Sequence, residues 1–309
     1  MQGQAKKLLA CAAMIAFFGS GQALAAGTET AAPRKAGGLS GCPVTIGIAG
    51  GAIAPKGKPL TVLNYSYRHK THIDDGPDGS ARTLSNEIWL LKLRYSPTDR
   101  VEFQLVPGFI NNHLDSFKGQ GEDHIYGAND FYLGGTYMFL SERFGDPVSA
   151  AVSFGFNLPT GGNGSSHPPG FDAWGAGGKI GLTKVWQPVH RFDTDLVYSQ
   201  PLESGNMGVK RGSTLTWNGS YHYILSDTFD VGVEWILEHG GEGEDRLGRD
   251  MNNDYTEMYA GPAINYIFPK KWGMWFGAGM YFPVFRDVDQ PRASENVRIE
   301  LKLGKVWGI

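Results

Sequence analysis

The chain has 309 residues, 44 of them glycine, with 12% aromatic and 19% charged residues and a mean hydropathy of −0.26. These averages match a soluble protein. They do not exclude a transmembrane β-barrel, because its strands alternate lipid-facing apolar with lumen-facing polar residues. The net charge of −3 and the absence of any basic block argue against binding to nucleic acid or to an anionic surface.

Residues 1–25 are predicted to be a cleaved signal peptide. A basic start at Lys6-Lys7 precedes the apolar run Leu8 to Phe18 and the small-residue cleavage site Ala23-Leu24-Ala25. The apolar run is shorter than the ~20 residues that a membrane-spanning helix needs. We therefore expect export, and removal of the two lysines takes the mature net charge from −3 to about −5.

Residues 26–58 are predicted to be a periplasmic N-terminal tail or a partial plug, because they are rich in Gly, Ala and Pro and show no sustained period. Cys11 leaves with the signal peptide, so the mature chain contains no disulfide. Leu39-Ser40-Gly41-Cys42 has the residue types of a lipoprotein processing site. A polar stretch separates it from the apolar run, and lipidation is therefore not expected.

Residues 59–309 are predicted to form an all-β, transmembrane antiparallel β-barrel, because apolar residues recur at every second position between turn-rich stretches. In the last segment, Arg298, Glu300 and Lys302 alternate with apolar residues. This alternation alone leaves a soluble β-sandwich open as an alternative. Twelve strands are predicted, over residues 60–72, 82–95, 100–112, 128–140, 148–158, 175–186, 191–202, 213–224, 229–239, 255–267, 272–284 and 296–307.

Short and long connections alternate between these strands without exception. This arrangement requires an even number of strands, with both termini on the periplasmic side and the longer loops outside. Seven aromatic residues lie at the short-turn ends, where a periplasmic aromatic girdle is expected. They are Tyr95, Trp186, Phe192, Tyr223, Phe229, Trp272 and Trp307.

Two glycine-punctuated stretches follow one another on the predicted fifth and sixth strands: Phe154-Gly155-Phe156-Asn157-Leu158-Pro159-Thr160-Gly161 and Gly177-Gly178-Lys179-Ile180-Gly181. Together with Gly47-Ile48-Ala49-Gly50-Gly51 and Tyr65-Ser66-Tyr67-Arg68, they resemble the MetA-pathway of phenol degradation family of outer-membrane transporters. The resemblance implies a channel for hydrophobic or aromatic small molecules that works by passive or facilitated diffusion. One departure from outer-membrane barrels is that the chain ends in Ile309 instead of an aromatic residue, although Trp307 lies on the same face two positions earlier.

Charged residues at lumen-facing positions are the candidates for selectivity, since charges on the lipid face cost about 2–4 kcal/mol at the midplane. Acidic residues gather on strands seven to nine and basic residues on strands one, two and twelve. These walls are opposite in a closed ring, which predicts a transverse field across the lumen. The alternative is that the charges pair and fill the lumen. The candidates are Arg68, Lys92, Arg94, Asp193, Asp195, Asp230, Glu234, Glu238, Arg298, Glu300 and Lys302.

Two other functional classes remain as alternatives, a membrane-embedded hydrolase of the phospholipase type and a structural barrel with a filled lumen. Asn218, Ser220 and His222 share the inner face of strand eight. We expect no carboxylate to orient His222, and residues two apart on a strand are ~6.6 Å apart, which argues against a catalytic triad.

No metal or cofactor is expected. Two loops carry groups of potential ligands, but neither has the spacing of a defined site. The run 250–254 begins like a calcium loop yet lacks the required Gly and Glu. The expected partners are a small-molecule solute, outer-membrane lipid and lipopolysaccharide, without nucleic acid. The loop residues are His69, His72, Asp74 and Asp75 in the first, and His113, Asp115, Asp123 and His124 in the second.

Overall fold

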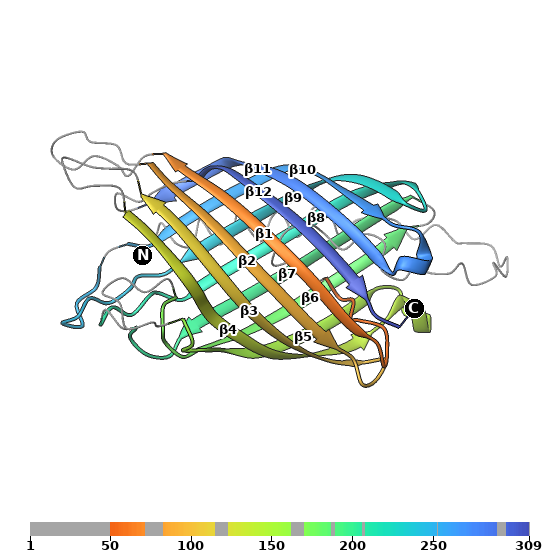
Figure 1. Cartoon of the computed structure of the whole chain (residues 1–309), viewed down its shortest axis with the longest axis horizontal. Coiled ribbons are helices and arrows are strands. Elements are labelled where there is room, and N and C mark those ends of the chain that lie inside the picture. The colour runs from red at the N-terminus through yellow and green to blue at the C-terminus, as the bar shows by residue number, and fades with distance from the viewer. Residues whose placement is uncertain are drawn as a thin grey trace, which may run out of the picture. The chain divides into compact units, whose positions relative to one another are not determined.

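The structure is a computed structural model that describes residues 50–71, 83–114, 123–161, 170–186, 189–205, 208–251, 253–288 and 295–308. The predicted signal peptide, Cys42 and the tail up to residue 49 lie outside these residues. Within them, twelve antiparallel strands close into a barrel (Figure 1). The strands are β1 (Pro59–Thr71), β2 (Thr83–Tyr95), β3 (Val101–Leu114), β4 (Asp123–Leu140), β5 (Ser149–Leu158), β6 (Gly175–Trp186), β7 (His190–Pro201), β8 (Thr214–Ser226), β9 (Phe229–Gly240), β10 (Tyr255–Ile267), β11 (Met274–Val288) and β12 (Glu295–Val306).

Each strand pairs with its neighbours in sequence, and β1 pairs with β12 to close the ring. The register of that closing pair runs from Leu60 opposite Val306 to Lys70 opposite Glu295. A closed ring leaves no sheet edge, so the backbone groups of every strand have hydrogen-bonding neighbours on both sides, as a lipid environment demands. The predicted twelve-stranded barrel is confirmed.

The two faces of each strand differ in the way that a membrane barrel requires. On β12, Leu301 and Leu303 are 36% and 39% exposed, whereas Glu300 and Lys302 are buried in the lumen. On β9, Val233 faces outward at 52% exposure and Glu234 is completely buried. Apolar side chains outside and polar side chains inside are the reverse of a soluble sandwich, and the sandwich alternative is therefore wrong.

The strand boundaries agree with the predicted ones to within two residues, except at two strand ends on the side of the long connections. β4 begins at Asp123 instead of residue 128, and β11 continues to Val288 instead of residue 284. As a result, the β3–β4 connection (115–122) and the β4–β5 turn (141–148) both span eight residues, and the strict alternation of connection lengths is wrong. The sequence missed these extensions because beyond the membrane both strand faces meet water, and the apolar alternation disappears while the pairing continues.

The short turns and both ends of the barrel domain lie at the same end, where β1 begins and β12 ends (Figure 1). Two of the turns contain a 3₁₀ helix, η1 (Glu142–Phe144) and η2 (Lys270–Trp272). Tyr95, Trp186 and Trp307 are between 45% and 50% exposed at this end, in the places predicted for the aromatic girdle. The described part of the chain contains no helix long and apolar enough to cross a membrane.

Candidate functional site: the barrel lumen

The acidic wall comprises the lumen-facing carboxylates of β7 and β9. Asp193, Asp195, Asp230 and Glu234 are all at most 3% exposed, as the alternation predicted, and Glu238 is half-buried and accepts a hydrogen bond from the hydroxyl of Tyr255. Each of these carboxylates has a partner on its own or an adjacent strand. The guanidinium of Arg191 lies 2.5 Å from Asp193, and the amide of Asn218 donates to Asp195 at 2.7 Å.

His222 lies at the centre of a buried polar network on this wall. Its Nδ1 lies 2.7 Å from Asp230, and its Nε2 lies 3.1 Å from Glu234, which also accepts a hydrogen bond from the hydroxyl of Tyr281 at 2.6 Å. The expectation that no carboxylate orients His222 is therefore wrong. The register explains this, because His222 is opposite Gly232, and the residues two positions to either side, Asp230 and Glu234, are its diagonal neighbours.

This network does not resemble a catalytic triad. Both ring nitrogens of His222 are engaged by carboxylates, and both can donate at once only when the imidazole is protonated. The hydroxyl of Ser220 makes no hydrogen bond within the described residues and is not joined to His222. His222 therefore bridges two carboxylates, and no nitrogen remains to act as a base for Ser220.

The basic wall, on β1, β2 and β12, also contains carboxylates of its own. Arg298 holds Glu295 at 2.8 Å, and Arg68 contacts the same carboxylate at 3.3 Å. Arg94 lies 2.7 Å from Glu102 of β3, and Glu300 accepts a hydrogen bond from the hydroxyl of Ser66 at 3.0 Å. The ion pairs described above therefore run along each wall.

The lumen-facing ionic residues that sequence reasoning missed include Glu102, Lys179, Arg191 and Glu295. Arg191 has the same strand parity as the inward Asp193 and Asp195, so the alternation could have found it. Lys179 could have been found from its alternation with Ile180 and Leu182, which face outward on β6. Glu102 is also two positions from the inward Gln104 of β3. Glu295 had been assigned to a loop, and by strand parity it would share the outward face of Val297; the bulge at Asn296 in the β1–β12 pair turns it into the lumen. Their presence makes the charge difference between the walls smaller than the sequence suggested.

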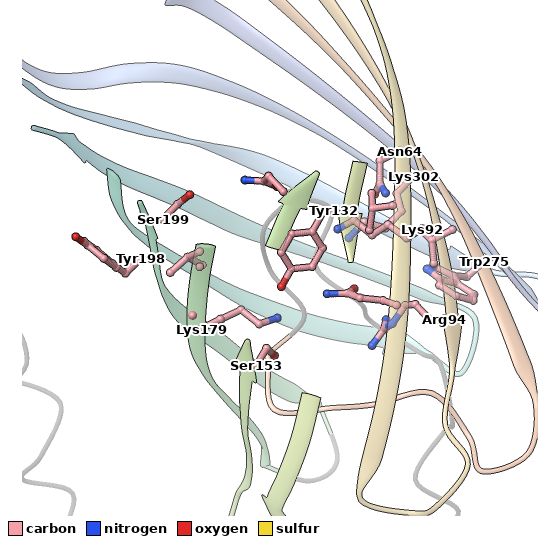
Figure 2. Close-up of a pocket in the computed structure, with 17 residues that line it drawn as sticks. Asn64, Lys92, Arg94, Tyr132, Ser153, Lys179, Tyr198, Ser199, Trp275 and Lys302 are labelled. Atoms are coloured by element: carbon pink, nitrogen blue, oxygen red, sulfur yellow. The ribbon is translucent and has the colours of Figure 1, made fainter. Parts of the chain in front are cut away.

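A cavity of about 290 Å³ lies inside the barrel and is lined by residues of nine of the twelve strands. Figure 2 shows Lys92, Lys302 and Arg94 near Asn64 and Trp275, with Tyr132, Lys179 and Ser153 along the rest of the cavity. The lining includes four cationic side chains and no carboxylate. The strand register brings Asn64 of β1 opposite Lys302 of β12, and Lys92 of β2 opposite Val62 of β1.

Residues 50–58 immediately precede β1, and Gly50, Gly51 and Ala54 of this segment are buried at the end of the barrel where the short turns are. The backbone N–H of Gly51 donates to the hydroxyl of Thr183 on β6 at 3.0 Å, and that of Ala54 donates to Glu102 on β3 at 2.6 Å. Ala54 also packs in the cluster of buried apolar residues at this end, which includes Leu60 and Trp275. The segment is therefore attached to several strands across this mouth.

The loops offer no assembled metal site within the described ranges. No group of three or more His, Cys, Asp or Glu residues there has the arrangement of a metal site. His113 and His124 face each other with ring nitrogens 2.8 Å apart, but they are exposed. His69 lies on β1, opposite Val297 of β12 and Ser85 of β2. The other candidate ligands of those loops (His72, Asp74, Asp75, Asp115 and the side chain of Asp123) lie outside the described part of the chain.

Asp245, near the calcium-like run 250–254, uses its carboxylate for hydrogen bonds within its own turn. It accepts hydrogen bonds from the backbone N–H groups of Arg249 and Leu247 and from the guanidinium of Arg249. The bonds from Arg249 are the main reason that the pKa of Asp245 lies below its usual value. This carboxylate therefore stabilises the loop conformation.

A family model described as "Putative MetA-pathway of phenol degradation" matches residues 75–285. Among solved structures, the COG4313 outer membrane channel from Pseudomonas putida F1 has a TM-score of 0.66 at 15% identity, covering 82% of this chain and 96% of that chain. The translocator domain of the autotransporter NalP from Neisseria meningitidis has a TM-score of 0.44 at 13% identity, covering 81% and 89%. No curated protein matches the chain.

The family match covers more than half of the chain. The fold is the closed barrel with an apolar outer face that bacterial outer membranes contain. The protein is therefore a bacterial outer-membrane β-barrel that belongs to the MetA-pathway of phenol degradation family.

Proposed function

We propose that the protein is a channel that carries small molecules across the outer membrane by passive or facilitated diffusion, without enzymatic activity. The observation that carries the proposal is the cavity of about 290 Å³, lined by four cationic and several apolar side chains, inside a closed barrel whose outer face is apolar. A barrel of purely structural function has no need of such a space, and close packing normally eliminates it. The family description and the channel from Pseudomonas putida support the same function.

The size and lining of the cavity favour small solutes with an aromatic or apolar body. Its volume lies at the lower end of the ~300–1,000 Å³ that small-molecule sites have. Val62, Val106, Tyr132 and Trp275 give it apolar and aromatic surface. The phenol degradation named in the family description supports aromatic compounds as the solutes.

The segment 50–58 would limit passage at the periplasmic mouth, as the periplasmic end of a partial plug formed by residues 26–58. Its hydrogen bonds to Thr183 and Glu102 attach it to β6 and β3, so a solute that leaves the barrel must pass beside it. The lumen charges would set which solutes pass this point. Acidic groups on β7–β9 and basic groups on β1, β2 and β12 support a weak transverse field, reduced by Arg191, Glu295 and Glu102.

The outward-facing apolar residues would contact outer-membrane lipid, and the charged external loops would contact lipopolysaccharide. A hydrolase of the phospholipase type is not favoured, because Ser220 and His222 are not joined by a hydrogen bond and both nitrogens of His222 are engaged.

The test is transport by the purified protein in liposomes and planar bilayers. A heat-dependent shift in gel migration first establishes that the barrel is folded. Liposome swelling is then measured with phenols, aromatic acids and sugars, and ion current is recorded in bilayers. We expect discrete current steps and faster swelling with single-ring solutes than with disaccharides. Folded protein that gives neither current nor swelling would contradict the channel function and would favour a structural barrel.

A further inference from the structure

The lining of the lumen cavity has one sign of charge. Lys92, Arg94, Lys179 and Lys302 all line it, and no Asp or Glu does. Lys302, Lys179 and Arg94 interact electrostatically with Lys92, and so does Asp195 of the acidic wall. Glu102 pairs with Arg94 from outside the lining. A cleft with such a lining concentrates anions.

The second observation is a pair of buried polar groups at the same cavity. Asn64 is completely buried, and neither its amide nitrogen nor its amide oxygen has a hydrogen-bond partner among the described residues. The indole N–H of Trp275, which is 1% exposed, also has none there. Both side chains line the cavity (Figure 2). Buried donors normally have a partner, so these two N–H groups are suited to a ligand that accepts hydrogen bonds.

The strands position these groups together. Asn64 is opposite Lys302 in the β1–β12 pair, and Lys92 lies two positions along β2 from the residue opposite Asn64. Trp275 is opposite Gly304, two residues from Lys302 on β12. One patch of wall thus presents two ammonium groups and two N–H donors, and Lys179 of β6 belongs to the same lining.

We propose that this cavity is a binding site for a small organic anion, a carboxylate attached to a single aromatic ring. The carboxylate would lie among Lys92, Lys302 and the amide of Asn64. The ring would lie against the apolar part of the lining, which includes Val62, Val106 and Tyr132. This inference rests on the proposed channel function and specifies the solute of the channel. The site would bind aromatic acids in preference to neutral phenols, because phenols lack the negative charge that the lysines recognise.

Benzoate and its neutral counterpart benzyl alcohol are suitable probes. Binding of each to the folded, detergent-solubilised protein is measured by calorimetry, which does not require transport. We expect benzoate to bind and benzyl alcohol to bind at least about tenfold more weakly. The Lys92→Gln/Lys179→Gln variant should lose benzoate affinity about tenfold or more. The Lys270→Gln/Lys271→Gln variant removes the same charge from an exposed turn and should bind as the unmodified protein does.

The Asn64→Leu variant tests the uncharged part of the site, and we expect it to weaken benzoate more than benzyl alcohol. Equal binding of the two probes, or unchanged benzoate affinity in the Lys92→Gln/Lys179→Gln variant, would overturn the proposal. Flux of the same probes into liposomes is measured in parallel. If benzoate binds and no solute crosses, the channel function fails and the site stands. If solutes cross without benzoate binding, the site fails and the channel stands.

Discussion

The guanidinium of Arg94 on β2 lies 2.7 Å from the carboxylate of Glu102 on β3, inside the lumen. The same carboxylate accepts a hydrogen bond from the backbone N–H of Ala54 at 2.6 Å. Glu102 therefore joins the barrel wall to the segment 50–58 at the short-turn end of the barrel. It is 1% exposed, so neither interaction is replaced easily by bulk water.

Replacing Glu102 by alanine should both destabilise the barrel and loosen the segment. Removal of one partner of a buried ion pair costs about 3–5 kcal/mol, because the remaining charge is left in a poorly solvated place. Unfolding in urea in micelles measures the free energy, and bilayer recording should show a larger single-channel current. The Arg143→Gln control removes an exposed pair with Asp99 and should cost about 1 kcal/mol or less. Equal effects of the two variants would contradict this assignment.

Gly181 on β6 tests the segment without removing any charge. A Cβ atom at this position would lie 2.2 Å from the carbonyl oxygen of Gly50, so the Gly181→Ala variant must displace the start of the segment. We expect a folded barrel with a higher conductance, because the obstruction at the mouth is moved. Gly135→Ala is the matched control, since a Cβ there would meet nothing closer than 3.7 Å. If both variants conduct like the unmodified protein, the segment does not limit the current.

The barrel itself was predictable because lipid on one face and the lumen on the other impose an alternation of apolar and polar side chains on every strand. Leu301 and Lys302 show this alternation in the sequence. The partners of the lumen charges were not predictable. Whether Asp230 and Glu234 reach His222 depends on the register of β8 against β9, and a shift of one residue would turn these side chains to the other face. The inward position of Glu295 was missed because it depends on the register shift between His69 and Lys70, which reverses the alternation at the start of β12.

The network around His222 is expected to stabilise the barrel and to take no part in hydrolysis. His222→Leu removes the shared partner of Asp230 and Glu234, and we expect a loss of about 3–5 kcal/mol in urea unfolding. Ser220→Ala removes a buried hydroxyl without a hydrogen bond in the described structure, so stability should be unchanged or slightly higher. Lipid or ester hydrolysis that is present in the unmodified protein and lost in Ser220→Ala would reverse this conclusion.

Lys302 and Arg298 provide a matched pair for the effect of lumen charge, because both are buried, inward-facing cations of β12. Lys302 lines the cavity, whereas Arg298 is held by Glu295 at 2.8 Å. The two positions are about 13 Å apart along the strand, beyond the screening length of about 8–10 Å in moderate salt. Their charges therefore act on different parts of the lumen.

We expect Lys302→Gln to lower the permeability ratio of anions to cations at least about twofold, because it removes a charge that faces the solute path. Arg298→Gln should instead cost about 3–5 kcal/mol of stability, since Glu295 loses its nearest partner, and should change the ratio less. Reversal potentials in a potassium chloride gradient give the ratio, and urea unfolding gives the stability. An equal change of the ratio in both variants would indicate that the net charge of the lumen, and not the charge at the cavity, determines which ions pass.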